Sequence, residues 1–244
     1  MSETLVINEI YLSLQGESTF AGLPCVFVRL TACNLRCSYC DTAYAFTEGK
    51  KQSLAEVRRE VHLLAKAFAA ETDARRLPLV ELTGGEPLLQ LNSVPLMRTL
   101  CDDGFTVLLE TSGALDIAPV DPRVHRIMDL KCPSSGEAAR NRFENIQHLK
   151  TNDEVKFVIG TTEDYEWART QLTQHRLASV CPVLFSWVAP LTPEQQDKSL
   201  KKISLGQTPL SRRELAERII ADALPVRFQV QMHKIIWAPD QRGV

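Results

Sequence analysis

The stretch CNLRCSYCDT, residues 33–42, decides the fold because it gathers three cysteines within eight positions. A structural zinc site requires four ligands that close around the metal, usually as Cys or Cys and His pairs. Beyond Cys33, Cys37 and Cys40, the nearest histidine in sequence, His62, falls within a predicted helix. A thioredoxin-like pair would use only two of the three cysteines. Three thiolates on an iron–sulfur cluster would leave one iron without a protein ligand. An open coordination position of this kind is typical of catalytic metal centres.

The rest of the composition is that of an ordinary globular protein. Of the 244 residues, 44% are hydrophobic and 24% are charged, and the net charge is −2, so we expect no direct nucleic-acid partner. The chain has neither the regions of a signal peptide nor an apolar run of about 18 residues that could span a membrane. We therefore expect a cytoplasmic protein in which the other cysteines are reduced core residues. These are Cys25, Cys101, Cys132 and Cys181.

Predicted strands and helices alternate on either side of the cysteine stretch. The helix signals are apolar residues at helical spacing and the capping-box sequences SLAE, from residue 53, and SRRE, from residue 211. The strand signals are short apolar runs. We expect strands at 25–30, 79–83, 105–111, 126–130, 154–159, 182–187 and 226–231. We expect helices from about residue 53, near 94–101, near 138–149, near 163–175 and from residue 211.

This alternation predicts an α/β fold with a parallel sheet. Six or seven units are too few for a full eight-unit barrel of roughly 250 residues. The sequence therefore favours a partial (shortened) parallel β/α barrel, with a doubly wound open sheet as the alternative. No domain boundary is visible, so residues 1–244 are predicted to form one domain. The polar segment 192–211 is expected to be a surface insertion.

Four polar motifs follow four of the predicted strands. The cysteine stretch follows the first strand, and GGEP, residues 84–87, follows the second. The motif ETSG, residues 110–113, closes the third strand, and DLKCPSSG, residues 129–136, closes the fourth. The carboxyl ends of parallel strands meet at one rim, where barrels and open α/β sheets bind ligands. The four motifs therefore predict one composite site.

The cysteine motif resembles the signature of the radical S-adenosylmethionine (SAM) superfamily. CNLRCSYC has the C-x-x-x-C-x-x-C spacing with an aromatic residue, Tyr39, before the last cysteine. The resemblance implies that Cys33, Cys37 and Cys40 hold a 4Fe–4S cluster and that SAM chelates the fourth iron. GGEP is similar to the second motif of the superfamily, and paired glycines allow a ligand to approach the backbone closely. The implied SAM-binding residues are Tyr39, Cys40, Asp41, Gly84, Gly85, Glu86, Ser112, Asp129, Leu130, Lys131 and Ser186.

Further stretches resemble the 7-carboxy-7-deazaguanine synthase family over nearly the whole chain, from residue 7 to about residue 234. They include INEIYLSLQGES, LTGGEP, DLKCPSSGE and the near-terminal QMHK. The resemblance implies a radical SAM lyase that converts 6-carboxy-5,6,7,8-tetrahydropterin to 7-carboxy-7-deazaguanine with loss of ammonia. The product would feed the biosynthesis of queuosine and other 7-deazapurines. The resemblance also implies a homodimer and a flavodoxin- or ferredoxin-type reductant.

The residue types fit a pterin that carries a carboxylate. Arg29 lies in an apolar strand near the cysteines, and a guanidinium pairs with a carboxylate through two hydrogen bonds. By resemblance, the hydroxyl of Thr42 ligates a Mg²⁺ ion, which needs few protein ligands because it keeps several waters. The predicted substrate-binding residues are Leu14, Gln15, Gly16, Arg29 and Thr83, and the predicted catalytic residues are Glu17, Glu110 and His233. Ten residues follow Lys234, in a region that family members use to close the substrate site.

Two alternatives use some of the same residues. A glycyl-radical-enzyme activase, or another small radical SAM enzyme, would keep the cysteines and GGEP but would have no need of Gln15, Arg29 and Thr42. A zinc or iron–sulfur protein without catalytic activity would need only the cysteines. Cleavage of SAM under reducing conditions distinguishes an enzyme from the second alternative.

Overall fold

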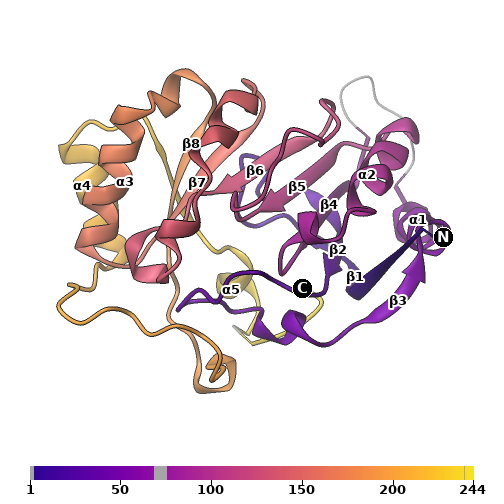
Figure 1. Ribbon diagram of the computed structural model, residues 1–244, viewed down its shortest axis with the longest axis horizontal. Helices are drawn as coiled ribbons and strands as arrows, with labels where there is room; N and C mark the ends of the chain where they lie inside the picture. Colours follow the sequence, from indigo (N-terminus) through magenta and orange to yellow (C-terminus); the bar gives the residue numbers. More distant parts are fainter. Residues whose placement is uncertain (1–2, 69–75, 239) are drawn as a thin grey trace.

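A nine-stranded sheet forms the frame of the molecule, in the order β3-β1-β2-β4-β5-β6-β7-β8-β9 (Figure 1). The computed structural model describes residues 3–68, 76–238 and 240–244. The strands from β2 to β9 pair in parallel, and β3 and β9 form the two edges. The parallel strands are β2 (Pro24–Leu30), β4 (Leu79–Gly84), β5 (Val107–Thr111), β6 (His125–Asp129), β7 (Glu154–Ile159), β8 (Val183–Trp187) and β9 (Arg227–Val230). The expected strands are therefore confirmed, and the sheet is an open, partial β/α barrel.

Two strands were not expected from the sequence. Strand β1 (Thr4–Leu14) lies antiparallel to both β2 and β3 (Lys50–Ser53). Leu5 and Ile7 of β1 are buried, which fits the alternation of a strand with one covered face. β3 contains no apolar residue, so its position depends on pairing with β1 rather than on a pattern in its own sequence.

The four longest helices all cover one face of the sheet, which excludes the doubly wound alternative. Helices α1 (Leu54–Ala65) and α2 (Ser93–Asp102) lie toward one end of the sheet, and α3 (Thr162–Gln174) and α4 (Arg212–Ala221) toward the other (Figure 1). Buried residues of all four helices share one apolar core with alternate residues of the strands. The two expected capping boxes are confirmed, with Ser53 and Ser211 as the capping residues.

The prediction of a helix near 138–149 is wrong. The segment forms 3₁₀ turns at Ala138–Arg140 and Phe143–His148 instead. The side chain of Asn141 bonds to both the N–H and the carbonyl of Lys131, at 2.8 and 2.9 Å. Asn145 donates to the carbonyls of Gly113 and Leu115. These side chains bind neighbouring backbone in place of the repeating bonds of a helix.

The opposite face of the sheet carries the features that position the site. A small apolar cluster, formed by Phe20, Cys25, Phe27, Leu79, Leu108 and Ile127, closes one end of this face. Because side chains two residues apart in a strand point the same way, the next inward positions are Glu81, Glu110 and Asp129. These positions lie toward the carboxyl ends of the strands. The strands therefore change from apolar to acidic along the inner face.

The segment 192–211 is mostly exposed and lies against the cysteine loop. The N–H of Lys201 donates to the carbonyl of Arg36 at 2.9 Å, and its ammonium lies 3.0 Å from the Glu137 carboxylate. That this segment is an insertion, and that the chain is one domain, stay predictions. Of the scattered cysteines, Cys25, Cys132 and Cys181 are buried, as expected, and Cys101 is partly buried. Among the described residues, no helix has the length and apolar character needed to cross a membrane.

Candidate active site

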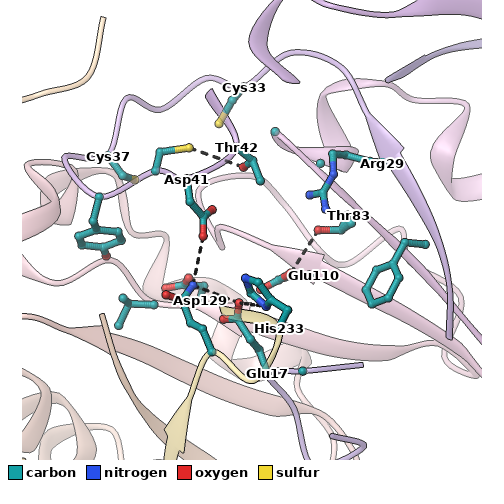
Figure 2. A pocket seen from close by; sticks show the side chains of 18 of the residues that line it. Glu17, Arg29, Cys33, Cys37, Asp41, Thr42, Thr83, Glu110, Asp129 and His233 are labelled. Atoms are coloured by element: carbon teal, nitrogen blue, oxygen red, sulfur yellow. Dashed lines mark hydrogen bonds and ion pairs between the residues drawn. The ribbon is translucent and has the colours of Figure 1, made fainter. Parts of the chain in front are cut away.

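One cavity at the carboxyl ends of the parallel strands brings together most of the predicted residues (Figure 2). Figure 2 shows the cysteines on one side and Glu17, Glu110 and His233 on the other. We call these two sides the cofactor half and the substrate half. The predicted residues that line the cavity are Leu14, Gln15, Gly16, Glu17, Arg29, Cys33, Cys37, Tyr39, Cys40, Asp41, Thr42, Thr83, Gly84, Gly85, Glu110, Ser112, Asp129, Lys131 and His233.

The backbone N–H groups of the cysteine loop donate hydrogen bonds to the end of the DLKCPSSG motif and to Glu137, the residue that follows it. The N–H of Ser38 donates to the Ser135 carbonyl at 3.0 Å, and the N–H of Arg36 donates to the Glu137 carboxylate at 2.7 Å. Glu137 is buried, so this second contact is shielded from water. Two of the four motifs therefore fix one another, independently of any bound group.

The three cysteine side chains are free thiols around the cavity. Burial raises the pKa of Cys37 to about 12 and also raises the pKa values of Cys33 and Cys40. A thiolate at these positions is therefore costly without a cationic partner, and metal coordination supplies one. Within the described part of the chain, no three His, Cys, Asp or Glu side chains converge closely enough to hold a single metal ion.

The two glycines of GGEP are explained by packing within the protein. A Cβ atom on Gly84 would lie 2.2 Å from the Leu30 carbonyl oxygen, and one on Gly85 would lie 2.1 Å from that of Ala32. Gly84 also has a φ of +143°, which favours glycine. The close approach expected for a ligand is therefore an approach to the start of the cysteine loop. Both glycines still line the cavity.

Three predicted SAM contacts, Glu86, Leu130 and Ser186, lie outside the cavity lining. The carboxylate of Glu86 is fully buried. It accepts hydrogen bonds from Thr111 at 2.9 Å and from the Ser112 hydroxyl at 2.6 Å. It therefore reaches the cavity through Thr111 and Ser112, which both line it. Leu130 packs in the main apolar core. Ser186 is buried beside Val158, which does line the cavity.

Arg29 lies in the substrate half with part of its guanidinium already engaged. Its Nε donates to Glu9 at 2.7 Å, and a terminal nitrogen donates to the Tyr11 hydroxyl at 2.7 Å. The Tyr44 hydroxyl also donates to Glu9, at 2.9 Å. These contacts fix the plane of the guanidinium and leave its remaining donors for the cavity. Although burial alone would lower it, Tyr11, Tyr44 and Glu9 raise the pKa of Arg29, so it stays charged.

The side chain of Gln15 has fewer free hydrogen-bonding groups for a substrate than the sequence suggested. Its side-chain oxygen accepts the N–H groups of Glu17 and Ser18, at 2.9 and 3.0 Å. Its amide nitrogen donates to Glu81 at 3.1 Å. One N–H of the amide is therefore left for a ligand.

The short helix α5 (His233–Ile236) brings the expected HK pair to the cavity. His233 Nδ1 lies 3.7 Å from Glu17, and the ammonium of Lys234 lies 2.6 Å from Asp41. Lys234 thereby connects the C-terminal segment to the residue that follows the last cysteine. Further along the chain, Asp240, Gln241, Gly243 and Val244 also line the cavity.

A charge that the sequence analysis missed lies at the centre of the substrate half. The ammonium of Lys156 contacts Glu110, lies 3.2 Å from Glu17 and lies 3.9 Å from Asp129. Burial would raise the pKa of Glu17, but Lys156 and then His233 lower it to about 2. The available signal was a single lysine within the apolar strand EVKFVI, and Glu81 in LVELT gives the same signal. Burial and then Glu110 raise the pKa of Glu81 to about 8.

Comparison with known proteins identifies the family. The model of the radical SAM superfamily matches residues 28–133. The chain is 44% identical over 240 residues to the 7-carboxy-7-deazaguanine synthase of Koribacter versatilis, covering 98% of this chain and 99% of that protein. It is 43% identical to the enzyme of the same name from Chlorobaculum tepidum, covering 98% and 97%. The chain belongs to the 7-carboxy-7-deazaguanine synthase family.

The fold agrees with this membership. The crystal structure of QueE from Escherichia coli matches with a TM-score of 0.67 at 21% identity and covers 93% of this chain and 94% of that one. At this identity the match concerns the fold alone. Membership of a radical SAM family implies a 4Fe–4S cluster and SAM as the cofactors.

The cofactor half fits these two groups. Besides the three thiols, it contains buried polar atoms without a hydrogen-bond partner among the described residues, namely Tyr39 Oη and Asp129 Oδ1. Ser186 Oγ, on the inner face of β8, is in the same state. Such atoms are rare in folded proteins and indicate room for a polar ligand. Lys131, 2.8 Å from Asp129, adds a cation beside them.

Proposed function

We propose that this chain is a radical SAM lyase that converts 6-carboxy-5,6,7,8-tetrahydropterin to 7-carboxy-7-deazaguanine with release of ammonia, as a step of queuosine or other 7-deazapurine biosynthesis. One observation carries the proposal. A single cavity joins three thiols at one side to a partly buried arginine and a group of carboxylates at the other, in a chain related over 98% of its length to 7-carboxy-7-deazaguanine synthases.

In the cofactor half, Cys33, Cys37 and Cys40 would hold the cluster, whose open iron would take SAM. Gly85, Ser112, Asp129 and Lys131 would bind SAM, with Lys131 beside its carboxylate, and the remaining predicted contacts would line it. When bound, these groups supply an electron and a carbon radical that removes a hydrogen atom from the substrate. Glu86 would act as a positioning residue, because its carboxylate fixes the Ser112 hydroxyl.

In the substrate half, Arg29 would bind the pterin carboxylate through the donors that Glu9 and Tyr11 leave free. Glu17 and Glu110 would accept hydrogen bonds from the amide and amino edge, and Gln15 would contribute its remaining N–H. The overall reaction releases ammonia and needs groups that accept and return protons. Glu17, Glu110 and His233 are the titratable side chains placed for this work.

The metal and the assembly complete the proposal. Thr42 lines the cavity and its hydroxyl caps no backbone N–H, so it is available to a Mg²⁺ ion that would also meet the substrate. A flavodoxin- or ferredoxin-type protein would supply the electron. We further propose a cytoplasmic homodimer. Exposed apolar residues of β9 and α5 support a subunit contact, namely Phe228, Ile235 and Ile236.

The test is an anaerobic reaction of the purified protein with 6-carboxytetrahydropterin, SAM, Mg²⁺ and dithionite. The proposal predicts that 7-carboxy-7-deazaguanine and ammonia form in equal amounts. SAM cleavage without any deazaguanine, together with radical formation on a protein substrate, would instead support a glycyl-radical-enzyme activase. A colourless zinc protein that leaves SAM intact would exclude both enzymes.

A further inference from the structure

Lys156 is a buried cation whose position calls for an explanation. Only 2% of its side chain is exposed, and a lysine this buried is rare unless it is paired. Val155, Phe157 and Ile159 of the same strand pack in the main apolar core beneath the helices. Because side chains alternate along a strand, Lys156 points to the opposite face, into the cavity that it lines.

Three carboxylates surround the ammonium, and each comes from a different part of the fold. Glu110 is the last residue but one of strand β5, Asp129 ends strand β6, and Glu17 lies in the loop after β1. Asp129 has a second cation, Lys131, at 2.8 Å. Glu110 and Glu17 have no other lysine or arginine within ion-pair distance among the described residues. Lys156 is therefore the main counter-charge for these two carboxylates.

Without this cation, the substrate half would hold several buried or partly buried carboxyl groups close together. Like charges in such a site cannot all ionise, and one or more would keep its proton. Glu81, buried next to Glu110, illustrates the effect, because burial and Glu110 raise its pKa to about 8. A protonated Glu17 could no longer accept a proton from a substrate.

We propose that Lys156 is a positioning residue of the reaction: its ammonium holds Glu17 ionised and keeps both Glu17 and Glu110 directed into the cavity, where they bind the pterin and accept protons. This inference rests on the proposed function and extends it to a strand residue outside the motifs. Lys156 itself touches the carboxylates rather than the reacting atoms. Its removal should therefore change the protonation of Glu17 more than the binding of SAM.

Other charged groups face the same site and set the background for its pH dependence. Glu17 is also approached by His233, 3.7 Å away, and accepts a hydrogen bond from Gln231 at 3.2 Å. These contacts remain when Lys156 is changed. The charged and titratable groups that face Lys156 are Glu17, Glu81, Glu110, Asp129, Lys131 and Glu154, with His233 behind Glu17.

The test compares Lys156→Met with Lys156→Arg. The methionine keeps the length and apolar character of the side chain and removes the charge, whereas the arginine keeps the charge. Lys150→Met is the matched control, because Lys150 precedes the same strand, bonds to the Pro122 carbonyl and stands outside the cavity lining. For each protein we would measure iron content, melting temperature, SAM cleavage, and the pH profile of deazaguanine formation.

Lys156→Met should keep the cluster and uncoupled SAM cleavage but lose about a hundredfold in deazaguanine formation at pH 7, because Glu17 and Glu110 would lose the contact that directs them into the cavity. The sign follows from Glu17, whose pKa is lowered to about 2 mainly by Lys156. Without the cation that pKa rises, so the acidic limb of the rate profile should move upward by about one pH unit or more. Lys156→Arg should keep the acidic limb of the unchanged protein, and Lys150→Met should keep both its limb and its rate.

Three results would overturn the inference. The first is a Lys156→Met protein with deazaguanine formation within twofold of the unchanged protein. The second is an equal loss of SAM cleavage and deazaguanine formation with the acidic limb in place, which indicates a structural role. The third is that none of the three variants folds, which also indicates a structural role. These variants are Lys156→Met, Lys156→Gln and Lys156→Arg. If the unchanged protein makes no deazaguanine, the proposed function fails instead.

A measurement on the protein without cofactors separates the two failures further. A carboxylate whose pKa is lowered in the folded state adds stability above its unfolded pKa, and this stability is lost as pH falls through the folded value. Lys156→Met should therefore lose the contribution of Glu17 at higher pH than the unchanged protein does. Melting curves between pH 3 and 7 that run parallel for the two proteins would contradict the inference whether or not the pterin is the substrate.

Discussion

The two halves of the cavity are built in different ways. In the cofactor half, the cysteines stand close together in sequence on one loop, and backbone hydrogen bonds from Ser38 and Ala32 hold that loop. In the substrate half, Arg29, Glu110 and Lys156 come from separate strands, and side-chain ion pairs hold them. Backbone contacts survive most substitutions, whereas an ion pair is lost when one partner changes. The cofactor half should therefore keep its structure under changes that disable the substrate half.

The largest expected effect is in the cofactor half. Cys37→Ala should remove the 4Fe–4S cluster, because one of only three protein ligands is lost, and with it both SAM cleavage and deazaguanine formation. Iron analysis and the absorbance of the anaerobic protein measure the first result, and product assays measure the second. Cys181→Ala is the control, because Cys181 is a buried core residue outside the cavity. Full iron and SAM cleavage in Cys37→Ala would break the assignment.

The next effect separates the halves. Arg29→Ala should weaken pterin binding by about 2–5 kcal/mol, the usual cost of truncating one partner of a buried charge pair. This corresponds to roughly 30-fold to several thousand-fold in affinity. Iron content and uncoupled SAM cleavage should stay, because Arg29 makes none of the backbone bonds of the cysteine loop. Substrate affinity and the two products are measured side by side. Equal loss of both products would show that Arg29 stabilises the fold rather than the substrate.

The third effect concerns Thr42, which lies at the boundary between the halves. Its hydroxyl is 3.7 Å from the sulfur of Cys40, and the loop fixes its position. Thr42→Ala should keep the cluster and SAM binding but lose the response to Mg²⁺ and about a hundredfold in turnover, as expected when a substrate is misplaced. Thr42→Ser should recover part of the rate. A Mg²⁺ titration of all three proteins is the measurement, and an unchanged midpoint in Thr42→Ala would place the ion elsewhere.

The smallest effect is a change in stability with pH at Glu81. Burial raises the pKa of this carboxyl from its ordinary value of 4.5 to about 8, so the folded protein holds a proton that the unfolded chain releases. Stability should therefore fall as pH rises from about 4.5 through about 8. Glu81→Gln removes this dependence and still accepts the hydrogen bond from Gln15. It should gain at least about 1.4 kcal/mol over the unchanged protein at pH 9, the free energy of one pKa unit.

The control for this prediction is the same pair of proteins at pH 4, where the carboxyl is protonated in both states and the difference should be small. Chemical denaturation at the two pH values gives both numbers. The difference in stability between Glu81→Gln and the unchanged protein is then compared at the two pH values. If Glu81→Gln loses stability against the unchanged protein on going from pH 4 to pH 9, Glu81 is ionised and paired. The substrate half would then carry one more negative charge than the structure indicates.

The difference between the halves also explains what could be predicted from the sequence. The parallel strands and the capping boxes at Ser53 and Ser211 were predicted because each depends on local patterns. β3 was missed because it is defined by its partner strand. The helix near 138–149 was wrong because Asn141 and Asn145 bind distant backbone, which no periodicity reveals.

The candidate site divides in the same way. Its cofactor half was predicted from motifs whose residues are neighbours in sequence. The sequence analysis missed three charged residues, Lys156, Glu81 and Glu9. The role of a charged residue within a strand depends on its partners, which the sequence does not show. The signal was present in Lys156, a lysine between valine and phenylalanine. The folded chain brings it to Glu110 on a neighbouring part of the sheet and to Glu17 in the loop after β1.

The most direct test of the division into halves is a single anaerobic assay that measures 5′-deoxyadenosine and 7-carboxy-7-deazaguanine in the same samples. It would compare the unchanged protein with Cys37→Ala and Arg29→Ala. The structure predicts both products from the unchanged protein, neither product from Cys37→Ala, and deoxyadenosine with little deazaguanine from Arg29→Ala. A fixed ratio of the two products in the unchanged protein and in Arg29→Ala would contradict the separation of the cavity into a cofactor half and a substrate half.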